Sequence, residues 1–152
     1  RGNVETRMGK VDAGLFDATL LAEAGLTRLD MKDVTRYPIS EEIIVPAPGQ
    51  AAIAVQTRDE DGELQTLLQQ IHDAKTEREV TIERSLLKRL GGGCALPLGC
   101  VCHIEGEMAE LRVFYANASG TEHYLATHRT PLSDIDTLLS QLIERLQHIT
   151  TA

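Results

Sequence analysis

The sequence has no tryptophan and few aromatic residues of any kind. Phenylalanine and tyrosine make up 3% of its 152 residues, so a hydrophobic core must be built from aliphatic side chains. No apolar run approaches the roughly 20 residues that a membrane-spanning helix needs, and we expect no membrane partner. Hydrophobic residues at 42% and charged residues at 25% are typical of a globular chain rather than a disordered one.

Basic residues are outnumbered by acidic ones. The chain has 15 Lys and Arg against 23 Asp and Glu, which gives a formal net charge of −8. General binding to nucleic acid depends on a basic surface, so we expect no nucleic-acid partner. An anionic ligand would therefore have to bind in a locally basic pocket.

Cysteine is scarce as well, and its three copies are clustered. Cys94, Cys100 and Cys102 fall within nine positions, a spacing that does not indicate a disulfide framework. Unpaired cysteines are typical of the reducing cytosol, so we expect a cytoplasmic protein. The first residue is Arg1 and no signal peptide follows it, which predicts a fragment or a chain whose N-terminus has been removed.

The N-terminal part of the chain predicts an incomplete α/β arrangement. Asn3 can cap a short helix that Gly14 closes. Residues 16–22 form an apolar run typical of a buried strand, and a second short helix follows over residues 24–29. Residues 50–56 predict another buried strand, of small residues. Neither strand has an obvious partner, so we expect this part to need a sheet that the sequence does not contain.

From Glu63 onward the pattern predicts a self-sufficient domain. Apolar spacing indicates a helix that begins near Glu63, and a capping box at Thr76 opens a second helix that runs to about Leu90. Ser133 is predicted to cap the last helix. Alternating patterns and turns predict an antiparallel meander, with strands over residues 99–105, 108–117 and 122–130.

These elements define the predicted fold class, which is α/β followed by α+β. The second domain has helices on one face of a three-stranded antiparallel sheet. We expect residues 62–152 to be the stable part of the chain.

A glycine-rich stretch, RLGGGCALPLG at residues 89–99, places Cys94 directly after a helix. Three interpretations are open: a small buried thiol, a nucleophile, or a metal ligand together with Cys100, Cys102 and His103. The negative end of the helix dipole disfavours a thiolate here. The spacing C-x5-C-x-C-H is not a usual zinc pattern, and His103 should lie on the opposite strand face from Cys100 and Cys102.

Three arginines lie around the loop–helix junctions of the N-terminal part: Arg1, Arg7 and Arg28. Surface solubility is one explanation for them. The other is recognition of carboxylate or phosphate, because the arginine guanidinium stays charged and offers a planar fork.

Four segments together resemble a known family. RGNVETR, DATLLAEAGLTRL, VPAPGQAAIAVQTR and ERSLLKRLGGGCALPLG occur in this order and look like the C-terminal half of porphobilinogen deaminase (hydroxymethylbilane synthase). The resemblance implies three domains, two of them α/β domains like those of periplasmic binding proteins. It assigns residues 1–43 to the end of the second α/β domain, residues 44–58 to a strand returning to the first, and residues 62–152 to the small α+β domain.

The resemblance also implies a function. Family members condense four porphobilinogen molecules into hydroxymethylbilane, with release of ammonia, in haem biosynthesis. They do so on a dipyrromethane cofactor that a thioether joins to a cysteine, which here is Cys94. By position, family arginines that bind acetate and propionate groups match Arg1, Arg7 and Arg28, and cleft-lining segments match Ala22, Gly25 and Gln50. The chain departs from many relatives at Gly91, where an acidic residue is common, and at Ala51, where glycine is common.

The family's catalytic aspartate would lie N-terminal to Arg1, so the resemblance assigns no catalytic residue and no metal site to this chain. We therefore expect the chain alone to be inactive. Its expected partners are porphobilinogen, the growing polypyrrole and the missing N-terminal half, and the complete enzyme is expected to be a monomer. Two other classes of function stay open: a non-enzymatic tetrapyrrole- or anion-binding module, and a Cys/His metal-binding domain.

Overall fold

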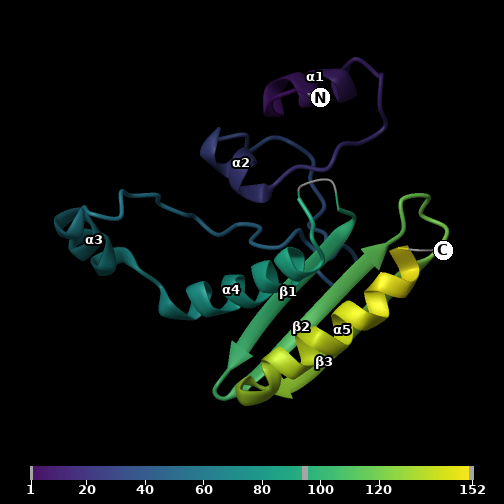
Figure 1. The fold of residues 1–152 in the computed structure, drawn as a ribbon. Helices are drawn as coiled ribbons and strands as arrows, with labels where there is room; N and C mark the ends of the chain where they lie inside the picture. The colour runs from purple at the N-terminus through teal and green to yellow at the C-terminus, as the bar shows by residue number, and fades with distance from the viewer. Residues whose placement is uncertain (1, 94–95, 151–152) are drawn as a thin grey trace. The chain divides into compact units, whose positions relative to one another are not determined.

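The computed structural model describes residues 2–93 and 96–150 of the chain. The chain divides into two compact units, Arg1–Ser40 and Glu41–Ala152 (Figure 1). The predicted domain boundaries at residues 43, 58 and 62 stay predictions, because this division reflects only contacts within the chain. Within the described ranges, no helix is both long enough and apolar enough to cross a membrane.

The first unit contains two short helices, α1 (Val4–Asp12) and α2 (Glu23–Arg28). As predicted, Asn3 caps α1, and its Oδ1 accepts a hydrogen bond from the Thr6 amide at 2.9 Å. The strand predicted over residues 16–22 is wrong: these residues form no strand and Phe16 is exposed. A buried strand needs a neighbour for its amides, and the described part of this unit supplies none.

The strand predicted over residues 50–56 is also wrong within the described structure. These residues run without ladder partners, and the side chain of Ile53 is 88% exposed. The apolar pattern was identified correctly, but a strand forms only where a second strand accepts and donates its backbone hydrogen bonds.

The second unit is built on the predicted antiparallel meander. Its strands are β1 (Leu98–Glu105), β2 (Met108–Ala116) and β3 (His123–Pro131), in the order β1-β2-β3. The first turn needs Gly106, whose φ of 59° lies in the left-handed region. This sheet confirms the α+β domain. The likeness of residues 1–58 to the α/β domains of periplasmic binding proteins stays a prediction.

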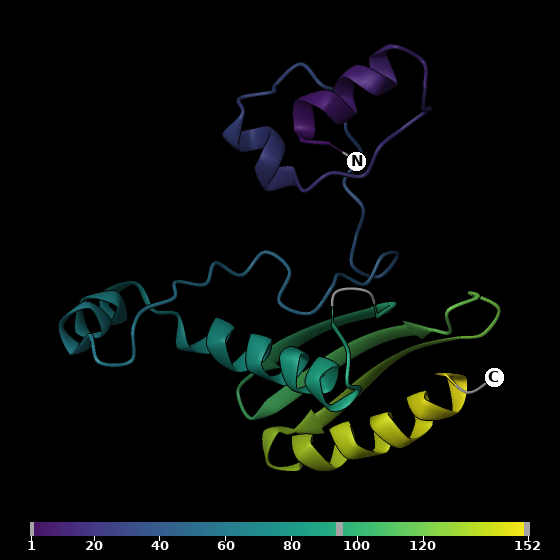
Figure 2. The same cartoon turned by 45° about the horizontal axis from the view of Figure 1, so that its top comes forward.

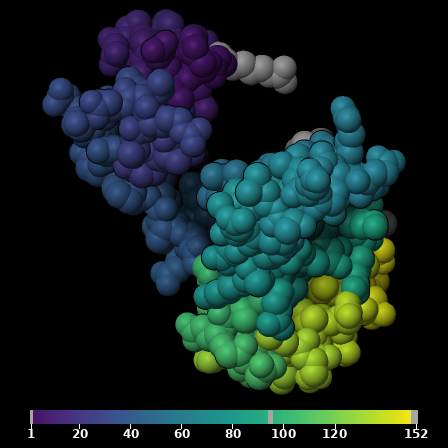
Figure 3. All heavy atoms as spheres, turned by 90° about the vertical axis from the view of Figure 1, so that its left-hand side faces the viewer, coloured from purple at the N-terminus to yellow at the C-terminus, as the bar shows by residue number. Residues whose placement is uncertain are grey.

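Two helices, α4 (Ala74–Arg89) and α5 (Ile135–Thr150), cover the same face of this sheet (Figure 2). The space-filling view shows them in teal and yellow beside each other (Figure 3). Leu86, Leu111, Leu139 and Leu146 are at most 2% exposed at the centre of the core. Each fully buried leucine contributes about 1.5–3 kcal/mol of transfer free energy. The core is mainly aliphatic, as predicted, with Tyr115 and Tyr124 as its aromatic members.

The predicted third helix exists but does not join the core. It is α3 (Gly62–Leu68), followed by the 3₁₀ turn η1 (Gln69–Ile71), and its apolar residues Leu64, Leu67 and Ile71 are exposed. Helical periodicity identifies an apolar face, but it does not say which surface will cover that face.

Two predicted helix caps are wrong. The N-cap of α4 is Asp73, whose Oδ1 accepts from the Thr76 amide at 2.8 Å, so the helix begins earlier than Thr76. Glu79, the expected partner in the capping box, instead bonds to strand β1. Ser133 lies inside a 3₁₀ turn, η2 (Leu132–Asp134), and α5 begins after it.

Candidate functional site

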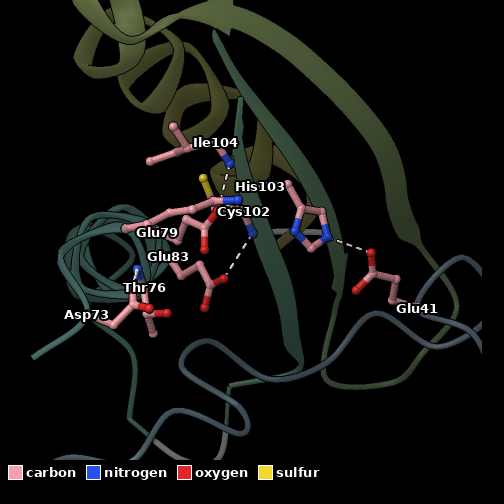
Figure 4. A network of polar contacts seen from close by, with 9 residues as sticks. Glu41, Asp73, Thr76, Glu79, Glu83, Cys102, His103 and Ile104 are labelled. Atoms are coloured by element: carbon pink, nitrogen blue, oxygen red, sulfur yellow. Dashed lines mark hydrogen bonds and ion pairs between the residues drawn. The ribbon is translucent and has the colours of Figure 1, made fainter. Parts of the chain in front are cut away.

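A buried carboxylate on α4 connects three parts of the second unit. Glu83 is 6% exposed and reaches from α4 to Cys102 of β1 (Figure 4). Its two oxygens accept hydrogen bonds from two different segments. Oε1 accepts from the Cys102 amide of β1 at 2.9 Å, and Oε2 accepts from the Gly49 amide at 2.6 Å. One side chain therefore ties α4 both to the sheet and to the segment that carries Gln50.

The outer edge of β1 is closed by acceptors that come from outside the sheet. β1 is an edge strand, so alternate amides point away from β2. The Cys100 amide donates to Pro46 O at 2.8 Å, the Cys102 amide to Glu83, and the Ile104 amide to Glu79 Oε1 at 2.7 Å. A buried amide without an acceptor would cost about 1–3 kcal/mol, and an open edge would invite pairing with another chain.

Burial raises the pKa of the Glu83 carboxyl above its ordinary value. The amides of Gly49 and Cys102 act in the opposite direction, because they stabilise the charged form, and they offset only part of the rise. Glu83 is thus a structural acceptor held in a poorly solvated position.

Residues 41–50, here called the strap, cross the edge of β1. On the open face of the sheet, His103 Nε2 lies 2.6 Å from Glu41 Oε1, and Arg112 Nη2 donates to Glu42 O at 2.7 Å. At the edge the strap passes so close that a Cβ on Gly99 would lie 2.6 Å from Val45 O. Position 99 therefore requires glycine.

The strap ends at one of the predicted site residues, Gln50. Its amide donates to Ala47 O at 2.9 Å, and its side chain is exposed. The next residue, Ala51, has a φ of 67°, in the region that favours glycine. This conformation agrees with the glycine that the sequence resemblance leads us to expect at position 51.

In the first unit, Arg7 on α1 is half-buried, and one nitrogen of its guanidinium is hydrogen-bonded. Its Nη2 donates to Thr19 Oγ1 at 3.0 Å and to Leu20 O at 2.8 Å. The guanidinium thereby anchors the chain just before α2. Its other N–H groups have no partner among the described residues, so Arg7 can still face a carboxylate.

The three remaining predicted residues of this unit lie on or beside α2. Ala22 is the exposed N-cap. Gly25 is where α2 approaches α1, since a Cβ there would lie 3.5 Å from Val4 Cγ2. Arg28 is the last helical residue; it is exposed and has no polar partner in the described part of the chain.

The structure brings Arg7, Ala22, Gly25 and Arg28 into one small unit, with Gln50 in the other. Cys94 and Arg1, which are also predicted site residues, lie outside the described residues. Sequence reasoning missed Glu79 and Glu83. The available signal was a pair of acidic residues at i and i+4, with Glu83 set between the core residues Ile82 and Leu86.

The other two cysteines are core residues. Cys100 and Cys102 are 0% and 2% exposed and share the helix-facing side of β1, while His103 is on the open face, as predicted. Burial, aided by the charge of Glu83, raises the pKa of the Cys102 thiol to about 12 and that of Cys100 still further. Across residues 2–93 and 96–150, no three His, Cys, Asp or Glu side chains form a group that could hold a metal ion.

Two protein-family models match the chain. Residues 1–66 match the model described as porphobilinogen deaminase, dipyromethane cofactor binding domain. Residues 77–136 match the model described as porphobilinogen deaminase, C-terminal domain. The first match contains Arg7, Ala22, Gly25, Arg28 and Gln50, and the second contains Cys94.

Burial predicts that the core thiols resist alkylation. With iodoacetamide at about pH 8.5, the ordinary pKa of a free thiol, Cys100 and Cys102 of the folded chain should stay unmodified. Peptide mass spectrometry should find both modified in denaturant. A Ser140→Cys variant places a thiol on the exposed side of α5 and should react while the chain is folded. Reaction of Cys102 at the rate of that control would contradict the assignment.

Proposed function

We propose that this chain, which belongs to the porphobilinogen deaminase family, carries the dipyrromethane cofactor of that enzyme on Cys94. The family is hydroxymethylbilane synthase, a transferase. The observation that supports Cys94 most directly is the burial of the other two cysteines, because an attachment point has to be reached by its ligand. Their raised pKa values make them still poorer nucleophiles at neutral pH.

The side chains of the first unit suit an anionic pyrrole ligand. Each porphobilinogen carries two carboxylates, so the growing product is a polyanion. Arg28 is exposed and unpaired among the described residues, and Arg7 keeps free N–H groups. We propose that these two, with Arg1, bind acetate and propionate groups, while Ala22, Gly25 and Gln50 line the cleft.

The proposed chemistry divides between the cofactor and the protein. When bound, the cofactor supplies the pyrrole on which the product is built. Each of four condensations forms one carbon–carbon bond and releases one ammonia. The arginines hold and neutralise the carboxylates, which a protein with a net charge of −8 can do only where cations are locally concentrated.

We further propose that residues 1–43 and 44–58 belong to two α/β domains like those of periplasmic binding proteins. The exposed apolar residues Phe16, Leu20, Ile53 and Val55 support this assignment, because they require a sheet from the rest of the enzyme. The complete enzyme would be a cytoplasmic monomer that takes porphobilinogen as its substrate.

Attachment at Cys94 predicts a defined covalent adduct. After incubation of the chain with hydroxymethylbilane, the Cys94 thiol should displace its hydroxyl as water, and intact mass spectrometry should detect a gain equal to hydroxymethylbilane less one water. All four pyrrole units stay on the isolated chain because it has no activity to cleave them off, and the protein should give the Ehrlich colour of a pyrrole with a free α position. Cys94→Ser should abolish both signals, while Cys100→Ala should keep them, because Cys100 faces the core. An adduct that survives in Cys94→Ser, or bound zinc without any adduct, would refute the attachment site.

The 152-residue chain alone should form no hydroxymethylbilane. The two carboxylates at the edge of β1, Glu79 and Glu83, are both occupied by backbone amides, so neither is available as an acid or base. The assay incubates the isolated chain with porphobilinogen and measures product against buffer alone. Product formation above that background would overturn the proposal that the catalytic carboxylate is supplied from outside this sequence.

A further inference from the structure

The outward side of α4 carries a basic groove beside the glycine-rich stretch. We call it the α4 groove; it has a volume of about 710 Å³ and is lined by Thr81, Arg84, Ser85, Leu87, Lys88, Gly91 and Gly92. Its lining contains two cations and two hydroxyls, and no carboxylate. In a chain with 23 acidic residues against 15 basic ones, such a lining is unusual.

The two cations of the groove have no partner among residues 2–93 and 96–150. Arg84 and Lys88 are spaced i and i+4, so they lie on the same side of the helix and repel each other. Neither makes a hydrogen bond or ion pair with any described residue. Arg89, one position further on, does pair with Asp136 of α5. No described acidic side chain relieves the repulsion between Arg84 and Lys88, and a bound anion would do so.

The helix dipole explains only part of this charge. A cation in the last turn of a helix is stabilised by the exposed carbonyl groups, and Lys88 and Arg89 occupy that turn. The effect falls off within one turn, so it does not account for Arg84, which lies one turn earlier.

The backbone at the end of the groove is already satisfied. The Gly91 amide donates to Lys88 O at 3.0 Å, and the Gly92 amide donates to Leu87 O at 3.2 Å. A Cβ at Gly92 would lie 2.5 Å from Leu96 Cδ2, so a side chain there would have to displace that of Leu96. A ligand in the groove would thus be recognised by side chains, through the Arg84 guanidinium, the Lys88 ammonium and the hydroxyls.

We propose that the α4 groove binds carboxylate groups of the pyrrole chain, a step that rests on the function proposed above. The two cations match the acetate and propionate that each pyrrole carries, and arginine binds a carboxylate with a planar fork. The groove is also close to Cys94 along the chain, because only two peptide units, each about 3.8 Å between Cα atoms, join Gly92 to it. The groove is therefore a carboxylate site of the second unit, built from other residues than Arg7 and Arg28.

The test uses the Cys94→Ser chain and a pyrrole that bears one acetate and one propionate but lacks the aminomethyl group. This probe cannot condense, so only reversible binding is measured. Amide resonances of residues 84–92 should shift on titration. Arg84→Gln/Lys88→Gln should weaken binding by at least about tenfold, the factor expected for a charge-assisted contact. The matched control Arg78→Gln/Arg129→Gln removes the same charge from exposed positions outside the groove and should leave affinity unchanged.

Inorganic phosphate is the second probe. Phosphate binding as tight as that of the pyrrole would overturn the assignment to pyrrole carboxylates, and so would an unchanged affinity in Arg84→Gln/Lys88→Gln. The two proposals fail separately. An adduct on the wild-type chain, with no shift of the residue 84–92 amides on titration of Cys94→Ser, overturns the groove alone. Shifts of these amides that Arg84→Gln/Lys88→Gln removes, without any adduct, support the groove as a carboxylate site and contradict attachment at Cys94.

Discussion

Hydrogen bonds from the outer edge of β1 to the carboxylates of α4 organise the second unit. Glu79 and Glu83 accept the amides of Ile104 and Cys102, so the helix is held against the sheet by more than its apolar face. The second oxygen of Glu83 accepts the Gly49 amide. A single buried side chain thereby sets the position of the strap relative to the helix, and its loss would leave amides without acceptors at two places.

This arrangement connects residues that are far apart in the sequence. The strap ends at Gln50, and α4 ends at the glycines that precede Cys94. Glu83 is bonded to the strap through Gly49 and belongs to α4. A change in its bond to Cys102 at the edge of β1 would therefore alter the positions of both segments. The α4 groove lies on the other side of the same helix, where Arg84 follows Glu83 directly. One helix thus uses its inward side for structure and its outward side for the proposed ligand.

The sequence predicted best what depends on local pattern. The three strands, the C-terminal helix and the end of α4 at the glycines all follow from periodicity and turn residues, and the structure confirms them. Sequence patterns predicted poorly those features that depend on a partner far away along the chain. Residues 16–22 and 50–56 have strand-like composition without a neighbouring strand in the described structure. The place of Glu83 between Ile82 and Leu86 puts it near the core, but it does not identify the amides of Gly49 and Cys102 as its partners. The two model matches confirm the family resemblance. The choice of Cys94 as attachment point stays a proposal, which the burial of Cys100 and Cys102 supports independently.

Amide hydrogen exchange in a Glu83→Gln variant tests the role of Glu83 most directly. Glutamine offers one acceptor oxygen in place of two, so it can satisfy the Gly49 amide or the Cys102 amide but not both. The account predicts slow exchange at Gly49, Cys102 and Ile104 in the wild-type chain. In the variant, exchange should accelerate at Gly49 or Cys102, while Ile104, which bonds to Glu79, stays protected. Unchanged protection at both Gly49 and Cys102 would contradict the account.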